Sequence, residues 1–129
     1  MGAALFAAIV ADDPERASAA FFPRAAFLLV KDIADPGRYY DQLYKRFQKD
    51  IHTLHKTLPA LSTAHFERVE VSPRGAFMRV HEEGNRLPYW AARHNTLHYR
   101  SAGRTFHFEL RVLITWNDHW YAIHLNEFH

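Results

Sequence analysis

The sequence contains no cysteine, and this absence removes several kinds of chemistry at once. Disulfide bonds, thiol nucleophiles and cysteine-rich zinc sites all require that residue. A chain without cysteine is compatible with a reducing compartment, so we predict a cytoplasmic protein.

The sequence also lacks a long hydrophobic run. No apolar stretch approaches the roughly 20 residues that a membrane-spanning helix needs. The N-terminal stretch has no basic leading segment, and its apolar part is short and ends at Asp12 and Asp13, which makes it a poor secretory signal. We therefore predict no membrane partner.

Net charge and glycine are scarce as well. The formal net charge of +2 is too small to argue for nucleic acid. The five glycines are scattered and form no phosphate-binding loop, and no Gly-x-Ser-x-Gly nucleophile elbow is present. We predict neither a cofactor nor a nucleic-acid partner. A basic helix face is expected to meet solvent, and it consists of Lys45, Lys49, His52 and Lys56.

Histidine and aromatic residues are abundant instead, with ten histidines and an aromatic fraction of 15%. Aromatic side chains bury large areas and favour strands. Histidine ordinarily titrates near a pH of about 6.5, so the net charge should rise steeply below neutral pH. A length of 129 residues with 48% apolar residues fits one globular domain, residues 1–129.

Helical patterns dominate the first half of the chain. Ala3–Ala11 is interpreted as a short helix, and Asp13-Pro14-Glu15 supplies a capping acid, a proline and a first-turn acid for a second helix. The apolar run Ala26–Val30 is interpreted as a buried strand. Asp35-Pro36 starts a long helix that we expect to end near Leu58, before the next proline.

The long helix carries one wide apolar stripe at three- and four-residue steps, which predicts that it packs on a large surface. The stripe consists of Tyr40, Leu43, Tyr44, Phe47, Ile51, Leu54 and Leu58.

After this helix the hydrophobic period changes from 3.6 to 2, as expected for strands. We predict strands over His65–Val71 and Ala76–Glu82, separated by the turn sequence Ser72–Gly75. Three more strands follow a loop at Gly84–Pro88, and they are joined by short connections at Ala102-Gly103 and Asn117-Asp118. Their predicted ranges are Tyr89–Arg100, Arg104–Thr115 and Trp120–Phe128.

The alternation of faces also predicts the register of this meander. A two-residue turn at Ala102-Gly103 places Tyr99 opposite Phe106, and apolar residues then meet apolar residues along the hairpin. The same register places His98 opposite His107 and Thr96 opposite Glu109. If Thr115 lies opposite Trp120 in the last hairpin, Val112 should pair with Ile123 and Arg111 with His124.

This order of elements resembles the nuclear transport factor 2-like or cystatin-like architecture. The run Asp118–Leu125 is similar to the final hairpin of many such domains, where a tight turn leads into Trp-Tyr and alternating apolar residues. The resemblance implies an α+β fold with N-terminal helices and one long helix packed on a curved antiparallel meander. It also implies a conical pocket between helix and sheet, in a family that hosts dehydratases, isomerases, binding modules and dimerisation domains.

Polar residues on the apolar face of the meander mark one candidate site. Arg93 and Asn95 interrupt that face, and buried polar groups must be paired. We interpret them as binding residues for a polar or anionic ligand, with Glu127 or His55 as a candidate general base. The predicted pocket walls are Tyr44, Tyr99, Trp116 and Tyr121. The alternative is that Arg93 sits at the sheet rim in an internal ion pair with Glu127 or Asp50.

The histidine-rich face is a second candidate site. His98, His107 and Glu109 together offer two imidazoles and one carboxylate to a zinc ion. Arg111 argues against a metal, because a guanidinium repels it. The alternatives are a solvated sheet face, or a sheet-to-sheet homodimer interface that also uses Trp90 and Trp120.

Three functions follow as hypotheses. The leading one is a small-molecule-binding domain with its pocket between helix and sheet. The second is a cofactor-free acid–base enzyme of dehydratase or isomerase type that uses the same pocket. The third is a structural module that dimerises through the polar sheet face.

Overall fold

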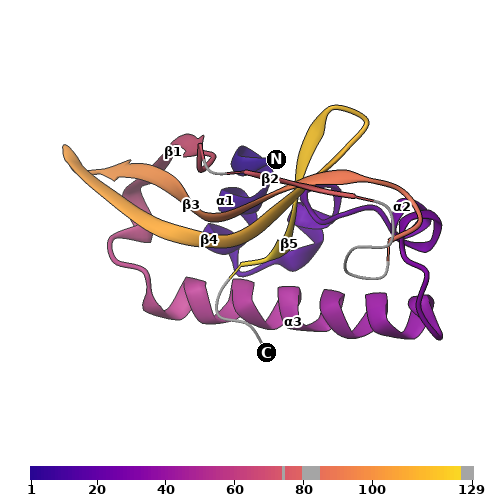
Figure 1. Ribbon diagram of the computed structural model, residues 1–129. Coiled ribbons are helices and arrows are strands. Elements are labelled where there is room, and N and C mark those ends of the chain that lie inside the picture. Colours follow the sequence, from indigo (N-terminus) through magenta and orange to yellow (C-terminus); the bar gives the residue numbers. More distant parts are fainter. Residues whose placement is uncertain (74, 80–84, 126–129) are drawn as a thin grey trace.

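The structure is a computed structural model that describes residues 1–73, 75–79 and 85–125. It confirms an α+β fold in which helices pack on a curved antiparallel sheet (Figure 1). The helices are α1 (Gly2–Ala11), the 3-10 helix η1 (Pro14–Ala20), α2 (Arg24–Val30), α3 (Pro36–Thr57) and the 3-10 helix η2 (Leu61–Thr63). The strands are β1 (Ala64–Glu70), β2 (Ala76–Met78), β3 (Tyr89–Ser101), β4 (Arg104–Trp116) and β5 (His119–His124).

The N-terminal region confirms two predicted helix starts and contradicts one predicted strand. The Asp13 carboxylate caps η1 by accepting a hydrogen bond from the Glu15 backbone N–H at 3.2 Å. Ala26–Val30, however, belongs to α2 and is not a strand. The burial pattern is helical, because Phe27 and Val30 are buried while Leu29 is 58% exposed. Ala, Phe and Leu are compatible with either structure, so a run this short does not decide between them.

Helix α3 confirms the strongest helical prediction. It starts after Asp35, whose carboxylate accepts a hydrogen bond from the Arg38 backbone N–H at 3.2 Å, and it ends one residue before Leu58. Its apolar side packs into the core, where the Tyr40 hydroxyl donates a 2.6 Å hydrogen bond to the Phe22 carbonyl. In Figure 1, α3 lies along the sheet, and α2 lies beside the end at which α3 begins. None of the helices in the described part of the chain combines the length and apolar character needed to cross a membrane.

The sheet is built around the β3–β4 hairpin, in the order β1-β3-β4-β5. Both β1 and β2 pair antiparallel with β3, β1 along its second half and β2 along its start. The two strands that were predicted on either side of the turn Ser72–Gly75 are therefore not paired with each other in the described residues. Each of them pairs with a different part of β3. The second predicted strand is also shorter than expected, and residues 80–84 lie outside the described part of the chain.

The predicted register of the β3–β4 hairpin is confirmed. Tyr99 pairs with Phe106, His98 with His107, and Thr96 with Glu109. The turn residues Ala102 and Gly103 both have positive φ, as do Asn117 and Asp118 in the next hairpin. This backbone geometry matches the right-handed twist of the strands it joins.

Candidate functional site

A cavity of about 480 Å³ lies between the helices α2 and α3 and one face of the sheet. Its apolar lining comes from every one of these elements and consists of Phe27, Ile33, Leu43, Ala91, Val112, Ile114 and Ile123. Two tyrosines, Tyr39 and Tyr89, add hydroxyl groups. The volume falls within the range of roughly 300–1,000 Å³ that small-molecule sites occupy.

Basic side chains complete the described lining. They are Lys31, which directly follows α2, Arg46 from α3, Arg93 from β3 and His124 from β5. No aspartate or glutamate lines the cavity among the residues that the structure describes. The cavity is therefore far more basic than the whole chain, whose formal net charge is +2.

Helix α3 contributes the wall opposite the sheet. Tyr39, Leu43 and Arg46 line the cavity, and their spacing of four and three residues puts them on one side of the helix. Tyr39 also stacks on Phe27 of α2, with ring centroids 6.0 Å apart, so the two helices meet at this end of the cavity.

Lys31 is held at that same end. Its Nζ donates hydrogen bonds to Asn85 Oδ1 at 2.7 Å and to the Tyr89 hydroxyl at 3.2 Å. The ammonium also lies 5.3 Å from the centroid of the Tyr89 ring, within cation–π range. Asn85 is fully buried, and its Nδ2 has no hydrogen-bond partner among the described residues.

A β-bulge in β5 positions His124, and it contradicts the predicted pairing there. Thr115 pairs with Trp120 and Leu113 with Ala122 as expected, but Val112 then pairs with His124 and not with Ile123. His124 accordingly does not lie opposite Arg111, whose backbone N–H donates to the Leu125 carbonyl at 3.2 Å. A one-residue slip moves a side chain to the other face of a sheet, so the bulge brings His124 to the cavity.

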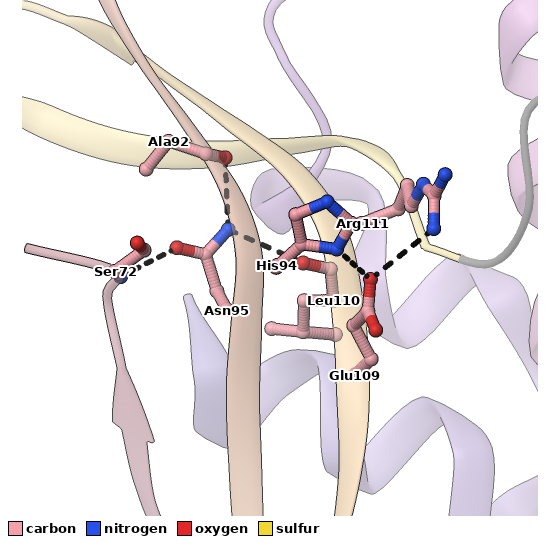
Figure 2. A network of polar contacts seen from close by, with 7 residues as sticks. All are labelled: Ser72, Ala92, His94, Asn95, Glu109, Leu110 and Arg111. Carbon is pink, nitrogen blue, oxygen red and sulfur yellow. Dashed lines mark hydrogen bonds and ion pairs between the residues drawn. The ribbon is translucent and has the colours of Figure 1, made fainter. Parts of the chain in front are cut away.

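Asn95 does not line the cavity, although the sequence suggested it. It is fully buried, and its Oδ1 accepts a hydrogen bond from the Ser72 backbone N–H at 2.8 Å (Figure 2). Its Nδ2 donates to the carbonyls of Ala92 at 2.9 Å and Leu110 at 3.2 Å. The amide therefore joins β3 to β4 and to the segment that follows β1.

His94, next to Asn95, has a φ of 61°, a left-handed conformation that few residues other than glycine adopt. At this bend the burial pattern is irregular, because Ala91 and Ala92 are both buried while Arg93 and His94 are both exposed, although the pairing with β4 continues in step. The three Asn95 hydrogen bonds lie at this bend (Figure 2). We conclude that they support the irregular backbone beside the cavity residue Arg93.

The aromatic residues predicted as pocket walls lie elsewhere. Tyr99 packs on Phe6, with ring centroids 4.9 Å apart, and its hydroxyl donates to the Pro59 carbonyl at 2.8 Å. The other three pack around the N-terminal aromatic residues. Tyr44 contacts Phe21 at a centroid distance of 5.3 Å, and Trp116 and Tyr121 contact Phe22 at 6.2 and 5.9 Å. Tyr121 also lines a second, smaller hollow with Met1 and Trp120.

His55, one of the two general-base candidates, does not line the cavity. His55 Nδ1 lies 2.8 Å from the Ile9 carbonyl, which can only accept, so Nδ1 is the donor and ties α3 to α1. Glu127 lies outside the described residues and stays a prediction from the sequence.

On the histidine-rich face, His98 and His107 are opposed as predicted, with ring centroids 6.0 Å apart. The hydrogen-bond partners of the nearby acids differ from those that the zinc hypothesis requires. His98 Nε2 lies 3.1 Å from Glu70 Oε1, whereas Glu109 Oε1 accepts from His94 Nδ1 at 2.7 Å and from Arg111 at 3.5 Å (Figure 2). The described residues contain no group of three or more side chains that could hold a metal ion.

The residue pattern singled out Arg93 but none of the other basic residues that line the cavity, which are Lys31, Arg46 and His124. Arg46 could have been found, because it follows the apolar stripe residue Leu43 by three positions. Lys31 was hidden by the wrong interpretation of α2. His124 was hidden by the bulge, which no residue pattern indicates.

Comparisons with models of protein families, with curated proteins and with solved structures found no match to this chain.

Proposed function

We propose that this protein is a small-molecule-binding domain whose ligand occupies the cavity between α2, α3 and the sheet. One observation carries the proposal, namely a cavity of about 480 Å³ with an apolar lining and a few polar groups, which is the usual composition of a ligand site. The nuclear transport factor 2-like resemblance implies a pocket in the corresponding place between helix and sheet. We also propose that the fold is of the nuclear transport factor 2-like kind. In this proposal Arg93 binds the ligand, and Asn95 supports the backbone beside Arg93.

A ligand screen with a cavity-filling variant tests this proposal. Ala91→Leu places three extra carbon atoms on the cavity floor, while Ala76→Leu adds the same atoms at an exposed position that pairs with Ala91. Compounds that raise the melting temperature of the unmodified protein should still do so for Ala76→Leu and should fail for Ala91→Leu. The proposal is wrong if no compound binds, or if every hit binds Ala91→Leu as well.

The acid–base enzyme would use the same cavity. Among the described lining residues, His124 is the one whose side-chain type exchanges protons near neutral pH. It is therefore the residue that an enzyme of this kind would use, in addition to the sequence-based candidate Glu127.

An exposed aromatic pair supports a second function, dimerisation through the outer sheet face. Trp90 is 50% exposed and Phe77 is 45% exposed, and their ring centroids are 5.2 Å apart on adjacent strands. Exposed aromatic residues of this kind are enriched at interfaces. Light scattering at high protein concentration should show a dimer that Trp90→Ser converts to a monomer, with Leu29→Ser on α2 as the control. A monomeric unmodified protein would remove this function.

A further inference from the structure

The basic residues of the cavity come from separate elements but gather mainly at one end. Arg93 and His124 both pair with Val112, so they lie in one row across three strands, about 10 Å apart at the backbone. Arg46 lines the same cavity from α3, two helical turns beyond Tyr39. Since Tyr39 lies at the Lys31 end, Arg46 is placed toward the Arg93 end.

Lys31 and Tyr89 define the opposite end. Tyr89 and Arg93 are four residues apart on β3, which corresponds to roughly 13 Å along the strand. The residues between these ends on the sheet are Ala91 and its partner Ile114, both of which line the cavity and are apolar. The site thus has an end with three basic residues, an apolar middle and a second end with the single basic residue Lys31 beside Tyr89.

This distribution selects a class of ligand. Guanidinium groups match the geometry of a carboxylate, and a charged group in a cleft with apolar walls produces a stronger field than it would on an open surface. Arg46, Arg93 and His124 each take part in further interactions within the chain, so a bound carboxylate would add to or replace these. The apolar middle requires a ligand that also carries a hydrocarbon body.

We propose that the ligand is a small amphipathic organic acid. Its carboxylate lies at the end lined by Arg46, Arg93 and His124, and its hydrocarbon body lies along Leu43, Ala91 and Ile114. This inference rests on the proposed function, because it assigns a chemical class to the ligand of the same cavity.

Calorimetric titration of the unmodified protein with matched acids and amides tests the assignment. The probes are phenylbutyrate with phenylbutyramide, octanoate with octanamide, and inorganic phosphate. Each acid should bind at least about tenfold more tightly than its amide, because the amide keeps the body and loses the charge. Phosphate should bind far more weakly than the acids, because it lacks the body.

Substitutions of the basic residues then show which side chains cause the difference in affinity between acids and amides. Arg93→Leu and Arg46→Leu should each lower acid affinity toward that of the amide and leave amide affinity unchanged, and Arg93→Lys should keep part of the difference. Arg100→Leu on the outer face of β3 and Lys49→Leu on the exposed side of α3 are matched controls that should change neither. Melting temperatures of all variants show whether each one is folded.

Each of the other possible results contradicts a particular part of the proposal. If amides bind as tightly as acids, the anionic class is wrong while the binding cavity stands. If phosphate binds as tightly as the acids, the hydrocarbon body is not recognised and the amphipathic class is wrong. If no acid or amide binds, the inference fails, and the Ala91→Leu screen decides separately whether the cavity binds anything.

Discussion

Arg93 and His124 lie on either side of Val112, in one row across β3, β4 and β5. The row exists because β5 contains one additional residue relative to β4 between Ala122 and His124. Without that bulge, the apolar residue Ile123 would pair with Val112 and would take the place of His124 in this row. The irregularity therefore adds His124 to a part of the cavity wall that Ile123 also lines.

The charge at position 124 should therefore control acid binding. His124→Lys is expected to tighten phenylbutyrate binding severalfold, His124→Leu to weaken it, and His124→Glu to abolish it, because the substituted charge lies at the proposed carboxylate site. The same substitutions at His107, which is exposed on the outer face of β4, serve as controls. Calorimetry that shows equal affinities for His124→Lys and His124→Glu would contradict the proposed position of the carboxylate.

The strongly periodic parts of the chain could be predicted from the sequence. The stripe of α3 and the alternation of β3 and β4 are long, so any error of phase or register would place many residues on the wrong side. Arg93 was recognisable for the same reason, as a polar residue within an apolar series.

The structures of α2 and β5 depend on local energetic differences that the hydrophobic pattern does not show. Helix α2 has seven residues, and its apolar run has the same appearance in a buried strand and in a buried helix. In β5, the residues before and after Ile123 fit the alternation of a strand with the bulge and without it. The residue pattern therefore does not indicate the bulge. Lys31 and His124 were missed in consequence, although they line the same cavity as Arg93.

Asn95 should be essential for stability although it does not line the cavity. Asn95→Ala removes hydrogen bonds to Ser72 N–H and to the carbonyls of Ala92 and Leu110. Leaving buried backbone groups unsatisfied costs about 1–3 kcal/mol each, so the loss of these three hydrogen bonds should lower the free energy of unfolding by at least about 3 kcal/mol. Urea denaturation measures it.

The isosteric variant Asn95→Asp separates shape from hydrogen bonding. It keeps the acceptor for Ser72 but loses both donors and places a carboxylate beside two carbonyls. It should be at least as unstable as Asn95→Ala. A variant with unchanged stability would show that the Asn95 amide does not support the bend.

The left-handed backbone of His94 makes a separate prediction. Asparagine tolerates a φ near this value of 61°, whereas a β-branched residue does not. His94→Val should therefore be less stable than His94→Asn by about 1–2 kcal/mol. Both variants lose the exposed contact with Glu109, so its contribution cancels in the comparison. Equal unfolding midpoints for the two variants would contradict the strained conformation.

Burial of Tyr40 should make the protein sensitive to alkaline pH. Removal from water, with charge repulsion from Tyr44 as a second cause, raises the pKa of Tyr40 from its ordinary 10.0 to about 12. Burial also raises the pKa values of Tyr44 and Tyr99. Because the folded state keeps these protons more tightly than the unfolded state, their contribution is complete below a pH of about 10 and is lost as the pH rises towards about 12.

Tyr40 alone should account for about 3 kcal/mol of the full alkaline loss, and for about 2 kcal/mol of it by a pH of about 11.5, since one pKa unit corresponds to about 1.4 kcal/mol. Tyr40→Phe should be less stable near neutral pH by about 1 kcal/mol, because the Phe22 carbonyl loses its donor. It should also lose less stability between a pH of about 9 and one of about 11.5, because one of the three shifted groups is gone. Urea denaturation at both pH values measures the difference, and an equal alkaline loss in Tyr40→Phe and the unmodified protein would show that Tyr40 does not carry it.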